Sequence, residues 1–322
     1  MENQTYKVGI IGGAGYTAGE LIRILRWHPA VEISFIHSQS QAGKFVSSIH
    51  HDLAGELMTC FTDEVDLSVD VLFLCSGHGK SKGWLAEHAV PKDTLVVDLS
   101  ADFRLDEAFV YGLPELNRRA IQQSRRIANP GCFATAIQLG LLPLAAQQAL
   151  PEEVHVHAIT GSTGAGQQPR DTTHFSWRNN NLSIYKAFNH QHLAEIGRSL
   201  QQLQPNTDPD IAFLPLRGDF ARGIFASLYL KTALSEAELQ SMYHYYYQEH
   251  VFTHAVPDNP HLKQVVNTNK CLVQVTKHGD RALIVSVIDN LLKGASGQAV
   301  QNMNLALGLP ETAGLQLKAM VF

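Results

Sequence analysis

In the first hundred residues, short hydrophobic runs alternate with segments whose hydrophobic residues recur at helical spacing. Continuous runs of this length are typical of parallel strands that are buried on both faces. Leu21, Ile22 and Leu25 predict a helix after the first run, and Lys82–Ala89 predicts another. The four predicted strands are Tyr6–Ile11, Val31–His37, Asp70–Cys75 and Thr94–Leu99. This order predicts an α/β fold with a Rossmann-type, doubly wound parallel sheet.

The pattern changes near position 131. A hydrophobic helical pattern runs from Cys132 to Leu150, and alternating strands then dominate, with helices expected at Ser235–Gln248 and Ser296–Leu307. The later strands are Val154–Ile159, Ile211–Leu214, Gly223–Lys231, Cys271–Lys277 and Ala282–Ile288. Such alternation predicts a mostly antiparallel sheet with one covered face. We therefore expect two domains: residues 1–131, to which 295–322 return, and residues 132–294.

Composition narrows the function classes. The chain has 322 residues, of which 45% are hydrophobic and 17% charged, and a formal net charge of −5. That balance does not favour nucleic acid or an anionic membrane as a partner, and no hydrophobic run is long enough to span a bilayer. Four cysteines lie scattered without CxxC spacing, and the N-terminus lacks the pattern of a signal peptide. We expect reduced thiols and a cytoplasmic protein.

A glycine-rich turn follows the first predicted strand and opens the first helix. Positions 13–18 match G-x-G-x-x-A, the pattern in which backbone N–H groups at a helix N-terminus bind a pyrophosphate. The alternative is a tight turn in an unrelated strand–helix unit. The candidate coenzyme contacts are Gly12, Gly13, Ala14, Gly15, Tyr16 and Thr17, with Ser76 at the end of the third strand.

The end of the second predicted strand bears on the choice of coenzyme. NAD-specific sites usually carry an acidic residue there, which binds the ribose 2′-hydroxyl. Here Ser38, Ser40 and Lys44 follow the strand, and the nearby acid Glu32 lies at its other end. Hydroxyls and a lysine suit a 2′-phosphate, so NADP(H) is the expected coenzyme, although an ordinary solvated loop has the same composition.

Cys132 follows Asn129, Pro130 and Gly131 and begins the hydrophobic helix. Unpaired N–H groups and the positive end of the helix dipole favour the thiolate, which is the nucleophilic form of cysteine. A buried, inert cysteine is the alternative.

Several further polar residues are candidates for ligand binding. His190 and His192 form an His-x-His pair, but no third metal ligand at suitable spacing accompanies them, so we expect no metal site. Arg104 and Arg222 can bind an anion or form surface ion pairs. The Gly161–Gly166 loop, including Gly164, can wrap a ligand, and Asn290 can bind a ligand amide or cap a helix.

Together these features resemble the N-acetyl-γ-glutamyl-phosphate reductase family and, more remotely, aspartate-semialdehyde and glyceraldehyde-3-phosphate dehydrogenases. The segments that match are Gly12–Leu21, Asp98–Leu105, Asn129–Thr135, Gly161–Gly166, Phe188–Ile196, Arg222–Ile224 and Asp289–Val300. The resemblance implies a Rossmann-type domain and a glyceraldehyde-3-phosphate-dehydrogenase-like α+β catalytic domain. It also implies a homodimer or homotetramer.

The resemblance further implies NADPH-dependent reduction of an acyl phosphate to an aldehyde in arginine biosynthesis. Cys132 would be the nucleophile that forms a thioester, and His192 the acid/base. Arg104, Asn129 and Arg222 would bind substrate, and Gly164 and Asn290 the coenzyme. In many members an arginine separates the two histidines, where this chain has Gln191, and Ser176–Asn181 matches no known family role.

The alternatives to this function differ either in the substrate or in the class of protein. An N-succinyl substrate would undergo the same reaction as an N-acetyl one, and other acyl-phosphate reductases act on aspartyl phosphate or carrier-linked substrates. A catalytically inactive NADP sensor and a zinc hydrolase built on His190 and His192 come from other classes of protein.

Overall fold

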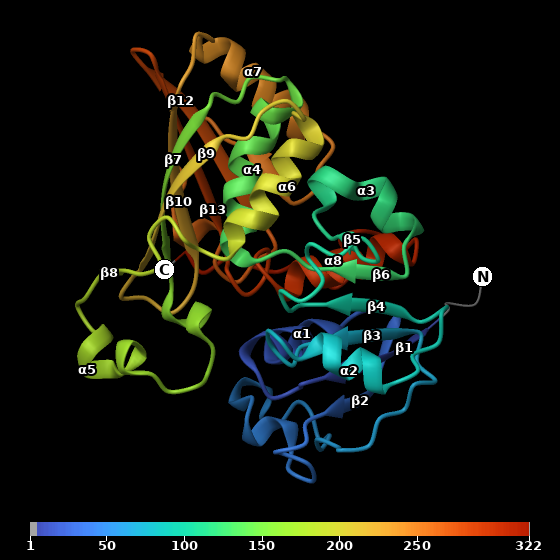
Figure 1. The fold of residues 1–322 in the computed structure, drawn as a ribbon. Coiled ribbons are helices and arrows are strands. Elements are labelled where there is room, and N and C mark those ends of the chain that lie inside the picture. The colour runs from blue at the N-terminus through green and yellow to red at the C-terminus, as the bar shows by residue number, and fades with distance from the viewer. Residues whose placement is uncertain (1–4, 322) are drawn as a thin grey trace. The chain divides into compact units, whose positions relative to one another are not determined.

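The computed structural model describes residues 5–321 (Figure 1). Contacts divide the chain into two compact units. Unit 1 comprises the residues up to Pro130 together with Ala295–Gln316, and unit 2 comprises Gly131–Gly294 together with the residues from Leu317 onward. The sequence analysis assigned all of 295–322 to the first domain, whereas the described residues 317–321 group with unit 2. One reason is the N–H of Met320, which donates to the carbonyl of Val266 at 3.3 Å.

Unit 1 is built on a parallel sheet with the strand order β2-β1-β3-β4-β6-β5. Its strands are β1 (Tyr6–Ile11), β2 (Val31–His37), β3 (Val71–Leu74), β4 (Leu95–Asp98), β5 (Val110–Tyr111) and β6 (Arg126–Ala128). All five neighbouring pairs are parallel. From β1 the chain continues first to β2 on one side and later to β3 on the other. The doubly wound prediction is confirmed, with its topological switch point between β1 and β3.

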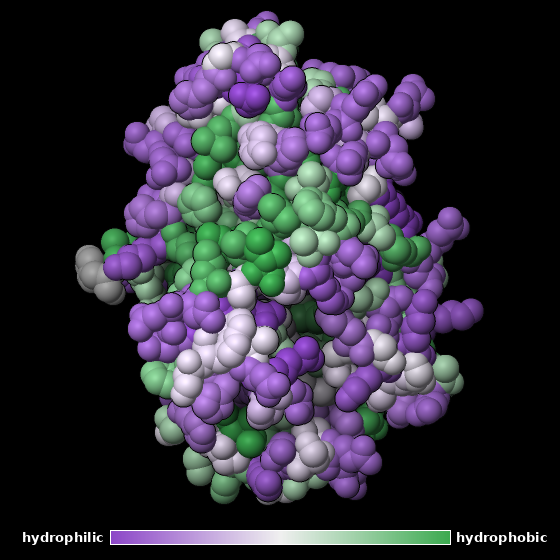
Figure 2. All heavy atoms as spheres, turned by 60° about the vertical axis from the view of Figure 1, so that its left-hand side comes forward, coloured by the Kyte–Doolittle hydropathy of each residue, from purple (hydrophilic) through white to green (hydrophobic). Residues whose placement is uncertain are grey.

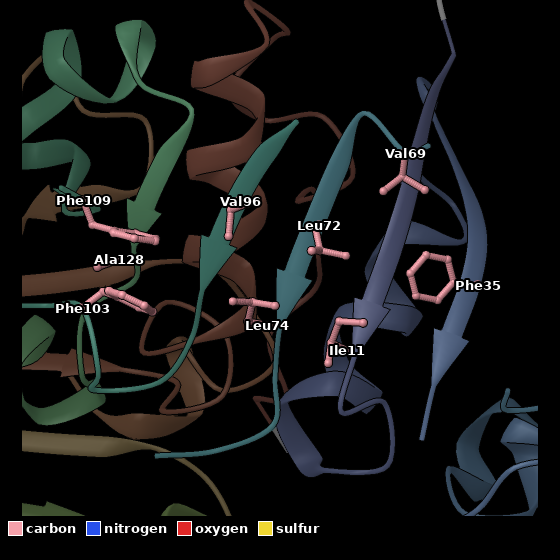
Figure 3. Close-up of a cluster of buried hydrophobic side chains, with 9 residues drawn as sticks. All are labelled: Ile11, Phe35, Val69, Leu72, Leu74, Val96, Phe103, Phe109 and Ala128. Atoms are coloured by element: carbon pink, nitrogen blue, oxygen red, sulfur yellow. The ribbon is translucent and has the colours of Figure 1, made fainter. Parts of the chain in front are cut away.

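Helices cover both faces of this sheet. On one side α1 (Tyr16–Leu25) and α3 (Pro114–Gln123) contact α8 (Ser296–Ala306), which also contacts β4. On the other, α2 (Ser81–Glu87) packs Trp84 and Leu85 against a buried cluster. Figure 3 shows this cluster, which consists of Ile11, Phe35, Val69, Leu72, Leu74, Val96, Phe103, Phe109 and Ala128. Phe103 and Phe109 stack with ring centroids 4.1 Å apart.

Unit 2 is built on a mixed sheet with the strand order β11-β12-β13-β10-β7-β9-β8. Its strands are β7 (Glu153–Thr160), β8 (Ser183–Ile184), β9 (Asp210–Arg217), β10 (Ile224–Lys231), β11 (Thr253–Ala255), β12 (Cys271–His278) and β13 (Arg281–Ile288). Four of its neighbouring pairs are antiparallel, and the pairs β7–β9 and β11–β12 are parallel. Mostly antiparallel pairing is what the alternation predicts.

The helix α4 (Cys132–Ala146) lies on one face of this sheet, with α6 (His192–Leu203) and α7 (Glu236–Tyr247) beside it (Figure 1). Every residue from Phe133 to Ala145 is buried, which is why α4 is hydrophobic all round. Gly140 lets it approach the sheet closely, because a Cβ there would lie 3.1 Å from Leu228 Cδ1.

Pro143 interrupts the hydrogen bonding of α4 because it has no N–H to donate to the carbonyl of Leu139. The hydroxyl of Tyr247 on α7 donates to that carbonyl instead, and the hydroxyl of Tyr243 donates to the next carbonyl, of Gly140. α7 thus compensates the proline in α4.

Several elements lie outside the sequence predictions. They are β5, α3, β6, α5 (Phe175–Arg178), β8, α6, β11 and five short 3-10 helices. α4 also ends at Ala146, before the predicted Leu150. Of the helices in the described part of the chain, none has the length and hydrophobicity needed to cross a membrane.

Candidate active site

The glycine-rich turn lies at the switch point of the unit 1 sheet. Gly12 has a φ of +79°, and a Cβ there would lie 2.6 Å from the backbone of Ser76, so only glycine fits. The N–H groups of Gly12 and Gly13 both donate to the carbonyl of His37, at 3.1 and 2.8 Å. The turn therefore joins the carboxyl ends of β1, β2 and β3, the edge at which doubly wound sheets bind ligands.

The start of α1 fits a dinucleotide phosphate. Gly15 is its N-cap, and a Cβ at Gly15 would face open space. The first turn, which includes Tyr16 and Thr17, contains no acidic side chain that would repel an anion. Helix N-terminal N–H groups and the helix dipole favour a negative group at such a position.

A histidine that was not among the predicted site residues supports the glycine-rich turn. His50 is buried, and its Nε2 lies 2.8 Å from the carbonyl oxygen of Gly13. Its ring also packs on α1, because a Cβ at Gly19 would lie 2.5 Å from His50 Nδ1. Phe61 contacts the same ring edge-on, with centroids 6.2 Å apart.

The loop after β2 presents the residues that favour NADP(H). Ser40 and Lys44 are exposed, and the Lys44 ammonium donates to Gln41 Oε1 at 3.0 Å. Ser38 is buried and pairs its N–H with the carbonyl of Thr62. The fold also places an acid, Asp63, near His37, which the sequence order did not suggest. Burial lowers the pKa of His37, and the negative charge of Asp63 raises it by a smaller amount.

Cys132 is the first residue of α4 and is half-buried. Gly131 is the N-cap, and the first turn of α4 contains no acidic residue. The N–H of Gly131 donates to Glu195 Oε2 at 3.0 Å. A carboxylate on α6 therefore fixes the entry into the helix that carries the thiol.

The same carboxylate faces His192. Glu195 Oε1 lies 3.8 Å from His192 Nε2, and both side chains are at most 7% exposed. The two residues are three positions apart on α6, which places them on the same helix face. Glu195 therefore connects the helix start at Cys132 with the predicted acid/base.

His190 supports His192 from the side. Its Nδ1 accepts the backbone N–H of His192 at 3.2 Å, and its ring lies 4.5 Å from the His192 ring. Phe133 packs against both rings. Burial and, second, the positive charge of Lys186 lower the pKa of His190 to about 4, so its imidazole is neutral near pH 7.

Many members of the family that this chain resembles have an arginine between the two histidines, where this chain has the uncharged Gln191. Lys186 places a positive charge beside Gln191 instead. Its ammonium donates to Gln191 Oε1 at 3.1 Å. Lys186 and Phe188 have φ values of 48° and 58°, in the left-handed region that side chains rarely adopt. A strained turn therefore places Lys186 beside the histidine pair.

Tyr185 lies on the other side of His190, with ring centroids 5.9 Å apart. Burial raises the pKa of the Tyr185 hydroxyl, and the negative charge of Cys132 raises it further. The guanidinium carbon of Arg217, at the end of β9, lies 4.6 Å from the Tyr185 ring centroid. The vicinity of the thiol thus includes Tyr185, which Arg217 covers.

The segment that matched no family role has a structural explanation. Arg178, at the end of α5, is buried and donates hydrogen bonds to the carbonyls of Thr172, Asn181 and Arg217 and to the Ser183 hydroxyl. It thereby fastens the segment Ser176–Asn181 to the end of β9.

Asn290 and Arg222, two residues of unit 2 that were predicted to bind ligands, form contacts with other residues of the protein. Asn290 Oδ1 accepts the N–H of Gly223 at 2.7 Å, and its Nδ2 donates to Thr163 Oγ1 at 3.0 Å. Arg222 forms an ion pair with the buried Asp289, with Nη2 3.0 Å from Oδ2. These contacts stabilise the loops around Thr163 and Gly223, and the amide and anion contacts expected of Asn290 and Arg222 stay predictions. Gly164 lies in the same loop and is exposed.

Arg104 and Asn129, two residues of unit 1 that were predicted to bind substrate, also form hydrogen bonds within the protein. Arg104 is buried and its Nε donates to the carbonyl of Asn129 at 3.0 Å. The Asn129 side chain donates to the carbonyl of Ala295 and accepts from Asn302. Within this unit they hold the backbone that precedes Pro130 in place, and the substrate contact expected of them stays a prediction.

The other three cysteines differ in exposure and do not pair with one another. Cys75 and Cys271 are buried, Cys60 is exposed, and no disulfide links any of the four cysteines, all of which lie in the described residues. Burial raises the pKa of the Cys75 thiol. Among residues 5–321, no group of three or more His, Cys, Asp or Glu side chains is arranged to hold a metal ion.

Two family models match the chain. Residues 7–124 match the semialdehyde dehydrogenase NAD binding domain, and residues 132–290 match the semialdehyde dehydrogenase dimerisation domain. An N-acetyl-gamma-glutamyl-phosphate reductase from Phocaeicola vulgatus is 59% identical over 98% of this chain and 99% of its own. The chain belongs to the N-acetyl-gamma-glutamyl-phosphate reductase family. A reductase of this name from Flavobacterium johnsoniae is 55% identical over 97% of this chain and 98% of its own.

Solved structures confirm the fold predicted for this reductase family member. Aspartate semialdehyde dehydrogenase II from Vibrio cholerae superposes with a TM-score of 0.75 at 18% identity, over 95% of this chain and 99% of its own. Aspartate semialdehyde dehydrogenase from Candida albicans, solved with NADP, gives a TM-score of 0.69 at 14% identity, over 94% of this chain and 98% of its own.

Four residues that lie around the predicted site residues of their own unit were not predicted: His50 in unit 1, and Tyr185, Glu195 and Arg217 in unit 2. Glu195 had a readable signal, because it lies three residues after His192 in the sequence, a spacing that puts two residues on one face of a helix. The other three had none, since strands and loops distant in the sequence bring them to their partners.

Proposed function

We propose that this protein reduces an N-acyl-γ-glutamyl phosphate, N-acetyl-γ-glutamyl phosphate in the first instance, to the semialdehyde and phosphate in arginine biosynthesis. The observation that supports this most is Glu195, whose two oxygens contact the Gly131 N–H and face His192. It joins a helix-start thiol to an acid/base, the pair that acyl transfer through a thioester requires.

The coenzyme site is the glycine-rich turn of unit 1. Gly12, Gly13, Ala14, Gly15 and the start of α1 would hold the pyrophosphate, with Ser76 across the switch point. When bound, the coenzyme supplies the hydride. Ser40 and Lys44 would bind the 2′-phosphate, so we infer a preference for NADPH. A kcat/KM for NADH equal to or above that for NADPH would contradict this inference.

Cys132 begins the reaction. Its thiolate, favoured by the N-terminal end of α4, attacks the acyl carbon, and the C–O bond to phosphate breaks with its electron pair leaving on the phosphate. The product on the enzyme is a thioester at Cys132. The acyl phosphate is already activated, so ATP is not needed.

His192 moves the protons. Reduction of the thioester carbon leaves an oxyanion, to which the protonated imidazole of His192 donates its proton. The same imidazole then accepts the hydroxyl proton as the C–S bond breaks, which frees the aldehyde and restores the thiolate. Glu195 stabilises the positive charge that His192 carries between these steps, and His190 holds the backbone of His192.

We also infer that the protein forms a homo-oligomer, a homodimer or homotetramer, in the cytoplasm. The face of the unit 2 sheet opposite α4 carries partly buried hydrophobic side chains, and Figure 2 brings that side forward with hydrophobic residues gathered on it. The partly buried side chains on this face of the sheet include Phe225, Leu272 and Leu283, which pack on Val265, Val285 and Val287. A single-subunit mass in light scattering would disprove the oligomer.

The reaction is tested with NADP⁺, phosphate and N-acetylglutamate semialdehyde, by following NADPH formation. We expect Cys132→Ser to abolish turnover and His192→Asn to lower kcat by about 10²–10⁴-fold without changing coenzyme affinity. Glu195→Gln should lower kcat by at least about tenfold, since it removes the negative charge beside the imidazolium. NADPH formation that persists undiminished in Cys132→Ser would refute the mechanism, and its absence in the wild type would support a sensor.

A further inference from the structure

The end of β9 places a guanidinium beside the site. Arg217 aligns with Thr160 of β7 and Ser183 of β8, so strands hold its backbone on both sides. Its carbonyl accepts a hydrogen bond from Arg178 at 2.6 Å. The base of this side chain is therefore fixed.

Only part of the hydrogen-bonding capacity of the Arg217 guanidinium is used within the protein. Its Nε is buried and has no hydrogen-bond partner, whereas the rest of its guanidinium hydrogen-bonds the Tyr185 hydroxyl. A buried donor without a partner is costly, and a charged one more so. By contrast, the donors of Arg178 are occupied by carbonyls and a hydroxyl of the protein.

The surroundings are positively charged. Arg217 and Arg178 repel one another, and Asp219 partly offsets that repulsion at Arg178. Lys186 adds a further charge next to Tyr185 in the sequence. An anion that reached Arg217 would relieve this imbalance, and Arg binds planar oxyanions through paired N–H donors.

Tyr185 relates Arg217 to the reacting thiol. Its ring stacks under the guanidinium at 4.6 Å, and the charge of Cys132 acts on its hydroxyl. Its N–H donates to the carbonyl of Pro215 at 3.1 Å, so the ring is anchored to the same strand as Arg217. The guanidinium therefore lies one aromatic side chain away from His190, whose ring contacts that of His192.

We propose that Arg217, supported by Tyr185 and Arg178, binds an oxyanion of the acyl-phosphate substrate, either its phosphoryl group or a carboxylate. This rests on the function proposed above and extends it, because the acyl-phosphate substrate carries a phosphate, an α-carboxylate and, if the acyl group is succinyl, a second carboxylate. The three groups are chemically alike for an arginine, and the experiment separates them.

The test measures the affinity of the full-length protein for three probes by calorimetry: inorganic phosphate, N-acetylglutamate and N-succinylglutamate. We expect Arg217→Gln to weaken at least one by about tenfold or more, and Arg217→Lys to restore it only in part, because lysine lacks the paired donors. Arg281→Gln, an exposed arginine on β13, is the matched control and should bind all three as the wild type does.

The pattern of loss identifies the source of the anion. Loss confined to phosphate assigns the phosphoryl group, and equal loss for both acylglutamates assigns a carboxylate of the glutamate part. Loss confined to N-succinylglutamate assigns the carboxylate of the acyl group. Each pattern supports the proposal.

Unchanged affinities, and unchanged KM values for semialdehyde and phosphate, in an Arg217→Gln protein that folds normally would overturn it. So would unchanged KM values combined with a shifted pH profile of Cys132 alkylation, which would make Arg217 a residue that only tunes the thiol. If Arg217→Gln does not fold, Arg217→Lys and Arg217→Met answer the same question. A wild type without cysteine-dependent turnover removes the proposed function, whereas the probe affinities still decide the role of Arg217.

Discussion

Gly294 lies directly against Cys132. A Cβ at position 294 would be 2.9 Å from the Cβ of Cys132 and 2.6 Å from the carbonyl oxygen of Asn290. The loop after β13 therefore limits the space around Cys132, and the absence of a side chain at 294 is a requirement of this packing.

Gly294→Ala should therefore displace Cys132. Because the added methyl meets backbone as well as the cysteine, we expect a loss of about 1–3 kcal/mol in the free energy of unfolding and a large fall in the rate of Cys132 alkylation. Gly197→Ala on α6 is the control, because a Cβ there meets nothing within 4 Å. Alanine at 197 should stabilise the helix, by up to about 1 kcal/mol. Unchanged alkylation in Gly294→Ala would contradict this account.

His50 should control coenzyme affinity without touching the chemistry. Its hydrogen bond to the carbonyl of Gly13 holds the glycine-rich turn, so His50→Ala should raise the KM for NADPH while kcat changes little. Loss of one such hydrogen bond costs about 1 kcal/mol, which corresponds to a several-fold rise in KM. The adjacent, exposed His51 provides the control variant His51→Ala. A fall in kcat alone would argue against a role in the turn.

His190 should make stability depend on pH. Its pKa is about 4 in the folded protein and 6.5 in the absence of burial, so the unfolded chain binds more protons between these values. Stability from this group is complete above pH 6.5 and is lost as the pH falls through 6.5 toward 4. Urea unfolding at pH 7 and pH 5 should show a smaller difference in His190→Gln than in the wild type.

Lys186→Gln refines the same test. Removing the neighbouring positive charge raises the pKa of His190 and should also reduce the pH dependence, though less than His190→Gln does. His278→Gln, at an exposed position, should leave the dependence as it is. An identical pH dependence in all three variants would exclude His190 as its source.

Tyr247→Phe should destabilise unit 2. The lost hydroxyl leaves the carbonyl of Leu139 buried without a donor, because Pro143 cannot supply one. The expected cost is about 1–3 kcal/mol, measured by urea unfolding. Tyr245→Phe, on the same helix and 71% exposed, should have almost no effect. Equal stability of the two variants would mean that the carbonyl finds another partner.

Much of the fold was predictable because its longest elements are either continuously hydrophobic or strictly periodic. β1 and β2 have the predicted bounds, and most other predicted strands differ by one to three residues at an end. α6 was not predicted although its hydrophobic residues recur at helical spacing, because its buried face includes the polar His192, Glu195 and Ser199 as well as Ile196 and Leu200. β5 and β6 are too short to produce a pattern.

The sequence by itself determined the family, the glycine-rich turn and the position of Cys132 at a helix start, because each is a local feature of consecutive residues. Only the tertiary structure decided which polar side chains form contacts within the protein itself. Asn290, Asn129, Arg104 and Arg222 all bind partners within the protein, whereas Glu195 joins Gly131 to His192 and Arg217 covers Tyr185. A side chain's hydrogen bonds depend on residues that are distant in the chain and close in space, and no local pattern records that distance.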